Sequence, residues 1–220
     1  GPLPANSFAY NDKITKYDFN NGAANAKLDE LGWTKLIINA DNVNSGSSEV
    51  KAAVSYASST SENVQGIWRF KKDKKGNVTL LTVKLSYIND NDSSLVAQKV
   101  KGYWDAVGVH TILDPVETSD ISNLISSRSF EALLFGQLLG GDPDIFAFWH
   151  SSQIDDRGMN ISGYKNDKVD KLLENARGTS DKASRIASYG EVQRIIADEL
   201  PAIFLYEKNY IYVQSKKVKG

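Results

Sequence analysis

Hydrophobic and polar residues alternate most regularly between positions 79 and 90 of the chain. The apolar members of this stretch are Leu81, Val83, Leu85 and Tyr87. A period of two is typical of a half-buried strand. From residue 96 the apolar positions change to helical spacing, so we expect a helix that begins at Asp92 or Ser93 and ends at Gly108.

Short strand-like and helix-like segments continue to alternate as far as residue 137. Residues 109–115 predict a strand, residues 118–129 a short helix, and residues 130–137 another strand. Strands joined by helices favour right-handed crossovers and parallel pairing. The pattern therefore indicates an α/β fold, in which helices flank a mixed, mostly parallel sheet.

The regions before residue 79 and after residue 137 show less regular patterns of hydrophobic and polar residues. Asn20 or Asn21 can cap a short helix that stops at Gly32, and residues 34–43 predict a strand that leads into a loop. Residues 44–66 are rich in Ser, Asn and Gly, and we expect a long irregular segment there. Two helices are predicted near the end of the chain, capped by Asn166 and Ser180, and strand-like segments follow at residues 202–206 and 210–214.

Composition narrows the classes of protein to consider. The chain has 220 residues, of which 41% are hydrophobic and 24% charged, and its net charge is −1. This balance gives no overall field that favours nucleic acid or an anionic membrane. The run "KKDKK" from Lys71 precedes Gly76-Asn77 between two strand-like segments, so a solvated hairpin turn is the favoured interpretation. Cysteine is absent from the sequence, which excludes disulfides and thiolate chemistry.

Catalytic and metal sites receive little support from the residues. His150 precedes Ser151 and Ser152, but neighbours in sequence do not have the geometry of a catalytic triad. His110 falls in a predicted strand without the spacing of a zinc ligand, and we expect it at a strand edge. Nucleotide-binding motifs are also missing, so no metal and no cofactor is expected.

The stretch "GDPDIFAFWHSSQ", residues 141–153, allows two interpretations. Asp142 can cap a helix whose first turn holds Pro143, with Asp144 near the positive end of the helix dipole. Alternatively, Asp142 and Asp144 could be the paired carboxylates of a carbohydrate-acting hydrolase. For the protein as a whole, a domain that serves only protein–protein contact is a further alternative.

The residues just before this stretch favour ligand contact over catalysis. They follow a predicted parallel strand, and ligands bind at the carboxyl edge of open α/β sheets. Gly136 would give a ligand access to the backbone, Gln137 an amide, and Phe135 with two leucines apolar walls. The expected ligand-binding residues are Phe135, Gly136, Gln137, Leu138, Leu139, Trp149 and Asn160.

Several segments together resemble the carboxyl-terminal lobe of family 5 extracellular solute-binding proteins, the oligopeptide, dipeptide and nickel receptors of ABC importers. They include the opening "GPLPANSFAY", then "YDFNNGAANAKLDELGW", "GIWRFKKDKKGNVTLLTVKLSY", "RSFEALLFGQLLGGDPDIFAFWHSSQ", "MNISGYKNDKVDKLLENAR" and "RIASYGEVQRIIADELPAIFLYEKNYIYV". The segments occur in the family's order and cover nearly the whole chain.

The resemblance implies a periplasmic-binding-protein-like fold of two lobes, of which residues 1–220 form one, as a single domain of a longer chain. It implies a receptor that is not an enzyme and lies outside the cytoplasmic membrane, either free or lipid-anchored. The implied partners are a small ligand, with a peptide as the first expectation, an importer permease and the missing amino-terminal lobe, but not nucleic acid. Peptide receptors of this kind place an aspartate before the D-P-D motif, where this sequence has Leu138 and Leu139.

Overall fold

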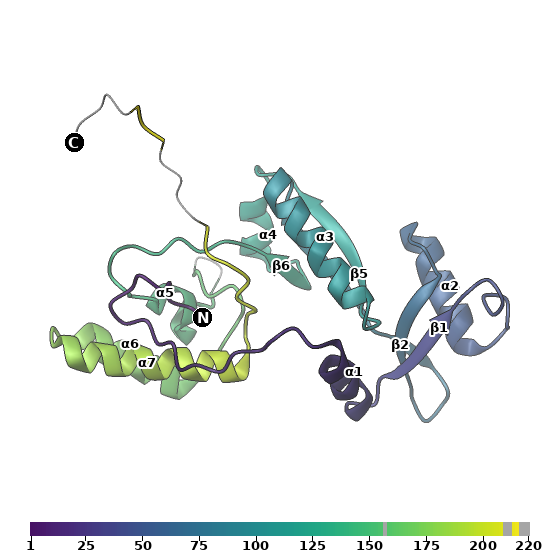
Figure 1. The fold of residues 1–220 in the computed structure, drawn as a ribbon, viewed down its shortest axis with the longest axis horizontal. Coiled ribbons are helices and arrows are strands. Elements are labelled where there is room, and N and C mark those ends of the chain that lie inside the picture. Colours follow the sequence, from purple (N-terminus) through teal and green to yellow (C-terminus); the bar gives the residue numbers. More distant parts are fainter. Residues whose placement is uncertain (156–157, 209–212, 216–220) are drawn as a thin grey trace. The chain divides into compact units, whose positions relative to one another are not determined.

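The computed structural model describes residues 1–155, 158–208 and 213–215. By its internal contacts the chain divides into two compact units, which Figure 1 shows as ribbons. One consists of Asp18–Gln137 and the other of Gly1–Tyr17 together with Leu138–Gly220. The expectation of a single domain over residues 1–220 stays a prediction beside this division.

The Asp18–Gln137 unit begins with a helix and an antiparallel sheet. Helix α1 (Asn21–Glu30) is capped by Asn20, as predicted, and Gly32 follows it with a φ of +80°. The sheet has the order β1-β2-β3, with β1 (Thr34–Ile38), β2 (Gly66–Lys72) and β3 (Val78–Leu80). Asp73 Oδ1 accepts the backbone N–H groups of Lys75 and Asn77 in the turn between β2 and β3. The basic run is therefore a hairpin turn, as predicted.

The prediction of an irregular segment over residues 44–66 is wrong. Ser48–Thr60 form helix α2, whose first turn is capped by the Ser47 side chain. Val50, Ala53 and Ala57 are buried at helical spacing and pack with Trp68 and Ile38 of the antiparallel sheet. Small apolar residues repeating at a period near 3.6 thus outweigh the serine-rich composition.

The second sheet of this unit is the predicted parallel one. Its strands β4 (Thr82–Ile88), β5 (His110–Val116) and β6 (Ala132–Leu134) lie in the order β5-β4-β6 and pair in parallel. Helices α3 (Asn91–Asp105) and α4 (Ile121–Ser127) connect them. Asp90 rather than Asp92 or Ser93 caps α3, and its buried residue Ala97 packs on Leu85 and Tyr87. The expected α/β fold with helices flanking a parallel sheet is confirmed.

The other unit is mainly helical. Its elements are α5 (Phe146–Trp149), the short 3-10 turn η1 (Ser151–Gln153), α6 (Asp167–Gly178) and α7 (Lys182–Glu199). Asn166 caps α6 as predicted, whereas Asp181 rather than Ser180 caps α7. Leu3 and Ala9 from the start of the chain join the core formed by α5, α6 and α7.

The chain leaves α7 at Leu200, which adopts a left-handed conformation before Pro201. Residues 202–206 follow without regular secondary structure, so the strand predicted there is wrong. Most of the other strand-like segment, residues 210–214, lies outside the described residues. Among the helices of the described part, none is long and apolar enough to cross a membrane.

Candidate ligand-contacting site

The residues expected to contact ligand follow strand β6. Its last residue, Leu134, pairs with Tyr87 of β4, so residues 135–137 lie beyond the carboxyl end of a parallel strand. Phe135 is 40% exposed, and Gly136 and Gln137 are exposed as well. A side chain added at Gly136 would meet no heavy atom within 4 Å, so its backbone is open to a ligand.

The two leucines that follow belong to the helical unit and differ in environment. Leu138 is 94% exposed, whereas Leu139 is partly buried and packs against the core of that unit. The Leu138 side chain is therefore accessible, and its contact with a ligand stays a prediction. Leu139 instead forms part of the wall of a hollow.

This hollow has a volume of about 280 Å³ and lies within the helical unit. It is lined by Leu3, Pro4, Asn6, Ser7, Leu139, Gly140, Gly141, Asp142, Pro143 and Glu207. Side chains added at Gly140 or Gly141 would meet nothing within 4 Å, so the peptide groups there are accessible. Ligand pockets usually occupy about 300–1,000 Å³, so the hollow is large enough for part of a ligand.

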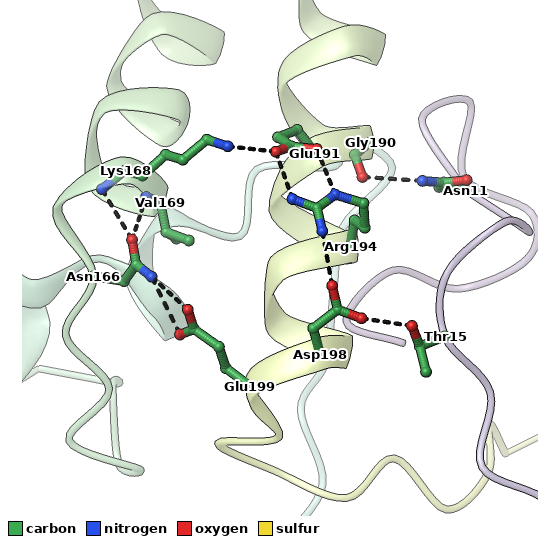
Figure 2. Close-up of polar contacts among 10 residues, drawn as sticks. All are labelled: Asn11, Thr15, Asn166, Lys168, Val169, Gly190, Glu191, Arg194, Asp198 and Glu199. Carbon is green, nitrogen blue, oxygen red and sulfur yellow. Dashed lines mark hydrogen bonds and ion pairs between the residues drawn. The ribbon is translucent and has the colours of Figure 1, made fainter.

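Polar contacts with α7 hold the amino-terminal wall of the hollow. Asn11 donates to the Gly190 carbonyl at 3.0 Å, and Thr15 donates to Asp198 at 2.5 Å. Figure 2 shows both bonds. The buried Gln193 side chain adds a bond to the Ala9 carbonyl at 2.8 Å. The same figure shows Asn166, the cap of α6, bonded to Glu199 of α7. The bonds of Ala9, Asn11 and Thr15 tie the chain to α7 just after Asn6 and Ser7, two lining residues that the sequence patterns did not reveal.

The structure corrects the expected helix cap at Asp142. Helix α5 begins only at Phe146, and Asp142 instead pairs with Arg185 of α7 at 2.6 Å. Asp144 Oδ1 accepts the Phe146 N–H at 3.1 Å, and its other oxygen pairs with Arg177 of α6 at 2.6 Å. The predicted structural role of the two carboxylates therefore takes the form of two ion pairs that join this loop to α6 and α7.

These ion pairs disfavour a carboxylate hydrolase. Each carboxylate has its own arginine partner, and the hydrogen bond from Arg185 lowers the pKa of Asp142 below its ordinary value. The general acid of a glycosidase requires the opposite shift, because it must hold a proton at neutral pH.

A double-mutant cycle should show that the Asp142–Arg185 pair is a modest ion pair. Since the Asp142 side chain is 57% exposed, we expect a coupling free energy of about 0.5–1 kcal/mol at pH 7. Because the pKa of Asp142 is lowered on folding, this coupling is present above its unfolded pKa of about 3.9 and is lost at lower pH. Urea denaturation of the single variants D142A and R185A and of the double variant checks this. A coupling unchanged at pH 3 would contradict it.

Trp149 and Asn160 lie in the core of the helical unit. Trp149 is 1% exposed and contacts Tyr164 and Phe204 through its ring. Asn160 is fully buried, and its amide nitrogen donates to the carbonyls of His150 at 3.1 Å and Tyr164 at 2.8 Å. These contacts are structural, and a ligand contact for either residue stays a prediction.

His150 is also a core residue. It is 7% exposed, stacks on Phe146 at 4.0 Å, and accepts the Ser152 backbone N–H on Nδ1 at 3.1 Å. The Ser152 hydroxyl lies 2.8 Å from the same nitrogen. Because Nδ1 caps the η1 turn, the arrangement favours a structural role over that of a catalytic base. In the described residues, no three His, Cys, Asp or Glu side chains are grouped to hold a metal ion.

The amino-acid sequence of this chain is similar to those of known peptide-binding proteins. No family model matches the sequence. Over 94% of its length it is similar to the oligopeptide-binding protein AppA of Bacillus subtilis, with 28% identity over 209 residues. A shorter match of 82 residues, 36% of the chain, is 40% identical to the probable D,D-dipeptide-binding periplasmic protein DdpA of Escherichia coli. The matches cover 33% of AppA and 16% of DdpA.

A solved structure confirms the fold. The oligopeptide-binding protein of Thermus thermophilus, determined with a pentapeptide, matches 90% of this chain with a TM-score of 0.68. The identity is 17%, and the match covers 31% of that chain. The resemblance seen in the sequence motifs is thus confirmed: the relatives of this chain are family 5 solute-binding proteins, and its 220 residues span about a third of the length of AppA.

Proposed function

We propose that the chain is one lobe of a longer receptor that captures a peptide outside the cytoplasmic membrane and delivers it to an ABC importer. The observation that carries the proposal is the match to the oligopeptide-binding protein AppA over 94% of the chain. The periplasmic location named for the relative DdpA supports the proposed compartment. The remaining lobe would be supplied by the rest of the receptor, since the match covers 33% of AppA.

The arrangement of side chains supports binding without chemistry. Asp142 and Asp144 are held in ion pairs, and His150 is in the core. In the helical unit, accessible groups include the peptide units of Gly140 and Gly141 and the side chain of Leu138. These groups can hydrogen-bond to a peptide and contact its apolar side chains, and the receptor would release it unchanged. In the other unit the Phe135 side chain is exposed.

The ligand class can be tested by calorimetric titration of the complete receptor. We expect binding heat with synthetic pentapeptides and nonapeptides, and none with maltose or a nickel–histidine chelate. AppA, whose solved structure contains a nonapeptide, is the positive control. If only maltose or only the chelate gives binding heat, the proposed ligand class is wrong and the receptor binds that compound's class instead. Absence of binding to all three would contradict the receptor function.

The contact role of Leu138 gives a separate prediction. Leu138→Ser should weaken peptide binding about tenfold, because it removes roughly 1.4 kcal/mol of apolar contact. The melting temperature should stay unchanged, since the Leu138 side chain touches little within its own unit. Leu95→Ser is the matched control, because Leu95 is 59% exposed on α3. Equal affinity of the L138S variant and the unmodified receptor would contradict the contact role.

A further inference from the structure

His110 lies where the two sheets of the Asp18–Gln137 unit meet. It is the first residue of β5 in the parallel sheet and is 7% exposed. Its ring stacks on Trp68 of the antiparallel sheet, with ring centroids 4.0 Å apart and planes 10° apart. Tyr56 of α2 contacts the same ring edge-on at 5.7 Å. One imidazole therefore contacts residues from β2 and α2 while belonging to β5.

Few backbone bonds support this junction. The two sheets form separate ladders, and Leu81 bridges them by donating to the Arg69 carbonyl at 2.8 Å and accepting from His110 N–H at 2.9 Å. Side chains add to this connection. Arg69 of β2 donates to the Val107 carbonyl just before β5 at 3.1 Å, and the buried Trp68 ring stacks on His110.

The charged groups near His110 are already paired with one another. Lys101 of α3 forms ion pairs with Glu62 at 3.2 Å and with Asp105 at 3.1 Å, and it also donates to the Thr111 carbonyl. Asp105 in addition accepts the Thr111 N–H at 2.9 Å. The two carboxylates are thus engaged by Lys101 and Thr111 rather than by the imidazole.

The imidazole itself has an unsatisfied atom. His110 Nε2 is buried and has no hydrogen-bond partner among the described residues. Burial lowers the pKa of His110; the charge of Lys101 acts in the same direction, and Asp105 and Glu62 oppose it. Protonation places an N–H on both ring nitrogens, so the charged ring carries a buried donor without an acceptor at Nε2.

We propose that His110 is an acid-sensitive switch between the two sheets: neutral, its ring holds them together, and protonated, it favours an open state in which the ring leaves Trp68 for water. The direction of the pH effect follows from the coupling between protonation and folding. A histidine whose pKa is lowered on folding gives stability at pH values above its free pKa of about 6.5, and this stability decreases as the pH falls below it.

Hydrogen exchange of the 220-residue chain at pH 7.5 and pH 5.5 tests the switch. If the closed state stays unprotonated, the population of the open state rises by up to about tenfold per pH unit below 6.5. After correction for the intrinsic pH dependence of exchange, amides of residues 67–70 and 111–113 should lose up to about tenfold in protection at pH 5.5. Unchanged protection would overturn the proposal.

Two variants separate His110 from other titrating groups. His110→Phe keeps a ring on Trp68 but cannot ionise, so its protection should be the same at both pH values. His150→Asn removes the only other histidine and keeps a capping oxygen, and it should respond to acid as the unmodified chain does. An H110F variant that still loses protection at pH 5.5 would overturn the proposal.

A direct titration keeps the proposal testable if H110F does not fold. The His110 ring carbon signal of the unmodified chain, followed by NMR, should titrate below pH 6.5. The Trp68 indole signal should change over the same pH range. An apparent pKa of 6.5 or higher for His110 would show that its protonation does not oppose the closed state.

Discussion

Replacing Arg69 with methionine is expected to lower the free energy of unfolding of the Asp18–Gln137 unit by about 3 kcal/mol. The Arg69 side chain is fully buried, and its guanidinium donates to the carbonyl oxygens of Val107 at 3.1 Å and Trp33 at 2.8 Å. Methionine has similar length but no donor, so both carbonyls lose their partner. An unsatisfied buried group costs about 1–3 kcal/mol; Val107 is buried and Trp33 partly buried, so their carbonyls together account for the expected loss.

The loss should be largest at α1. This helix has no buried residue of its own, and Arg69 binds it through Asn25 at 2.6 Å and through Asp29. Urea denaturation gives the change in stability, and hydrogen exchange should show α1 amides losing protection first. Asp29→Asn is the control: its side chain is 62% exposed, so a loss below about 1 kcal/mol is expected. Equal losses in R69M and D29N would contradict this account.

Trp149→Ala is expected to destabilise the helical unit by about 3–5 kcal/mol, the usual loss for a buried tryptophan. The Trp149 side chain is 1% exposed, and its ring lies 6.2 Å from that of Tyr164 and 5.9 Å from that of Phe204. Truncation leaves a cavity that these neighbours can fill only in part.

The matched variant Trp149→Phe keeps an aromatic ring and should lose much less stability. Thermal and urea unfolding of both variants, with peptide titration of the complete receptor alongside, separates a core role from a ligand contact. If W149A keeps its stability but loses peptide affinity, Trp149 is a wall of the binding site instead.

Local sequence signals predicted the parallel sheet well. The strand β4, the helical spacing in α3 and Gly108 at its end agree with the fold, but β4 is not half-buried as predicted, since Ser86 is buried as fully as Leu85 and Tyr87. Gly108 has a φ of +88°, and a Cβ there would lie 2.7 Å from Arg69 Cγ, so both conformation and space require glycine. The glycine signal is strong because local sterics produce it, and the two periodic patterns are strong because each repeats over several residues.

Other features depend on partners far away in sequence. The sequence does not reveal helix α2, because its small apolar residues are spread among serines. Their common face becomes clear only in the structure, where they pack on Trp68. The D-P-D motif resembles a helix start, but its two carboxylates form ion pairs with arginines of α6 and α7. Apolar residues at 202–206 favour a strand, yet the sequence does not show whether a sheet edge is available to them.

The candidate site also has one part that the local sequence predicts and one part that depends on residues far apart in sequence. Exposure of Phe135, Gly136, Gln137 and Leu138 follows from their place after a parallel strand, which the sequence indicates. The hollow, by contrast, combines residues 3–7, 139–143 and 207, and no local pattern brings these stretches together. Residue type alone did not reveal that Trp149 lies in the core.

The helical unit is built from two segments that are far apart in the sequence, and this affects when it can fold during synthesis. Residues 18–137 are contiguous and can fold as soon as they leave the ribosome, whereas Asn11 must wait for Gln193, which lies 182 residues further along. At about 5–20 residues per second, synthesis of that interval takes roughly 10–35 s. Throughout this time Leu3 and Ala9 have no helical core to pack against. A nascent chain is thus expected to need chaperone protection at residues 1–17 until α7 has been made.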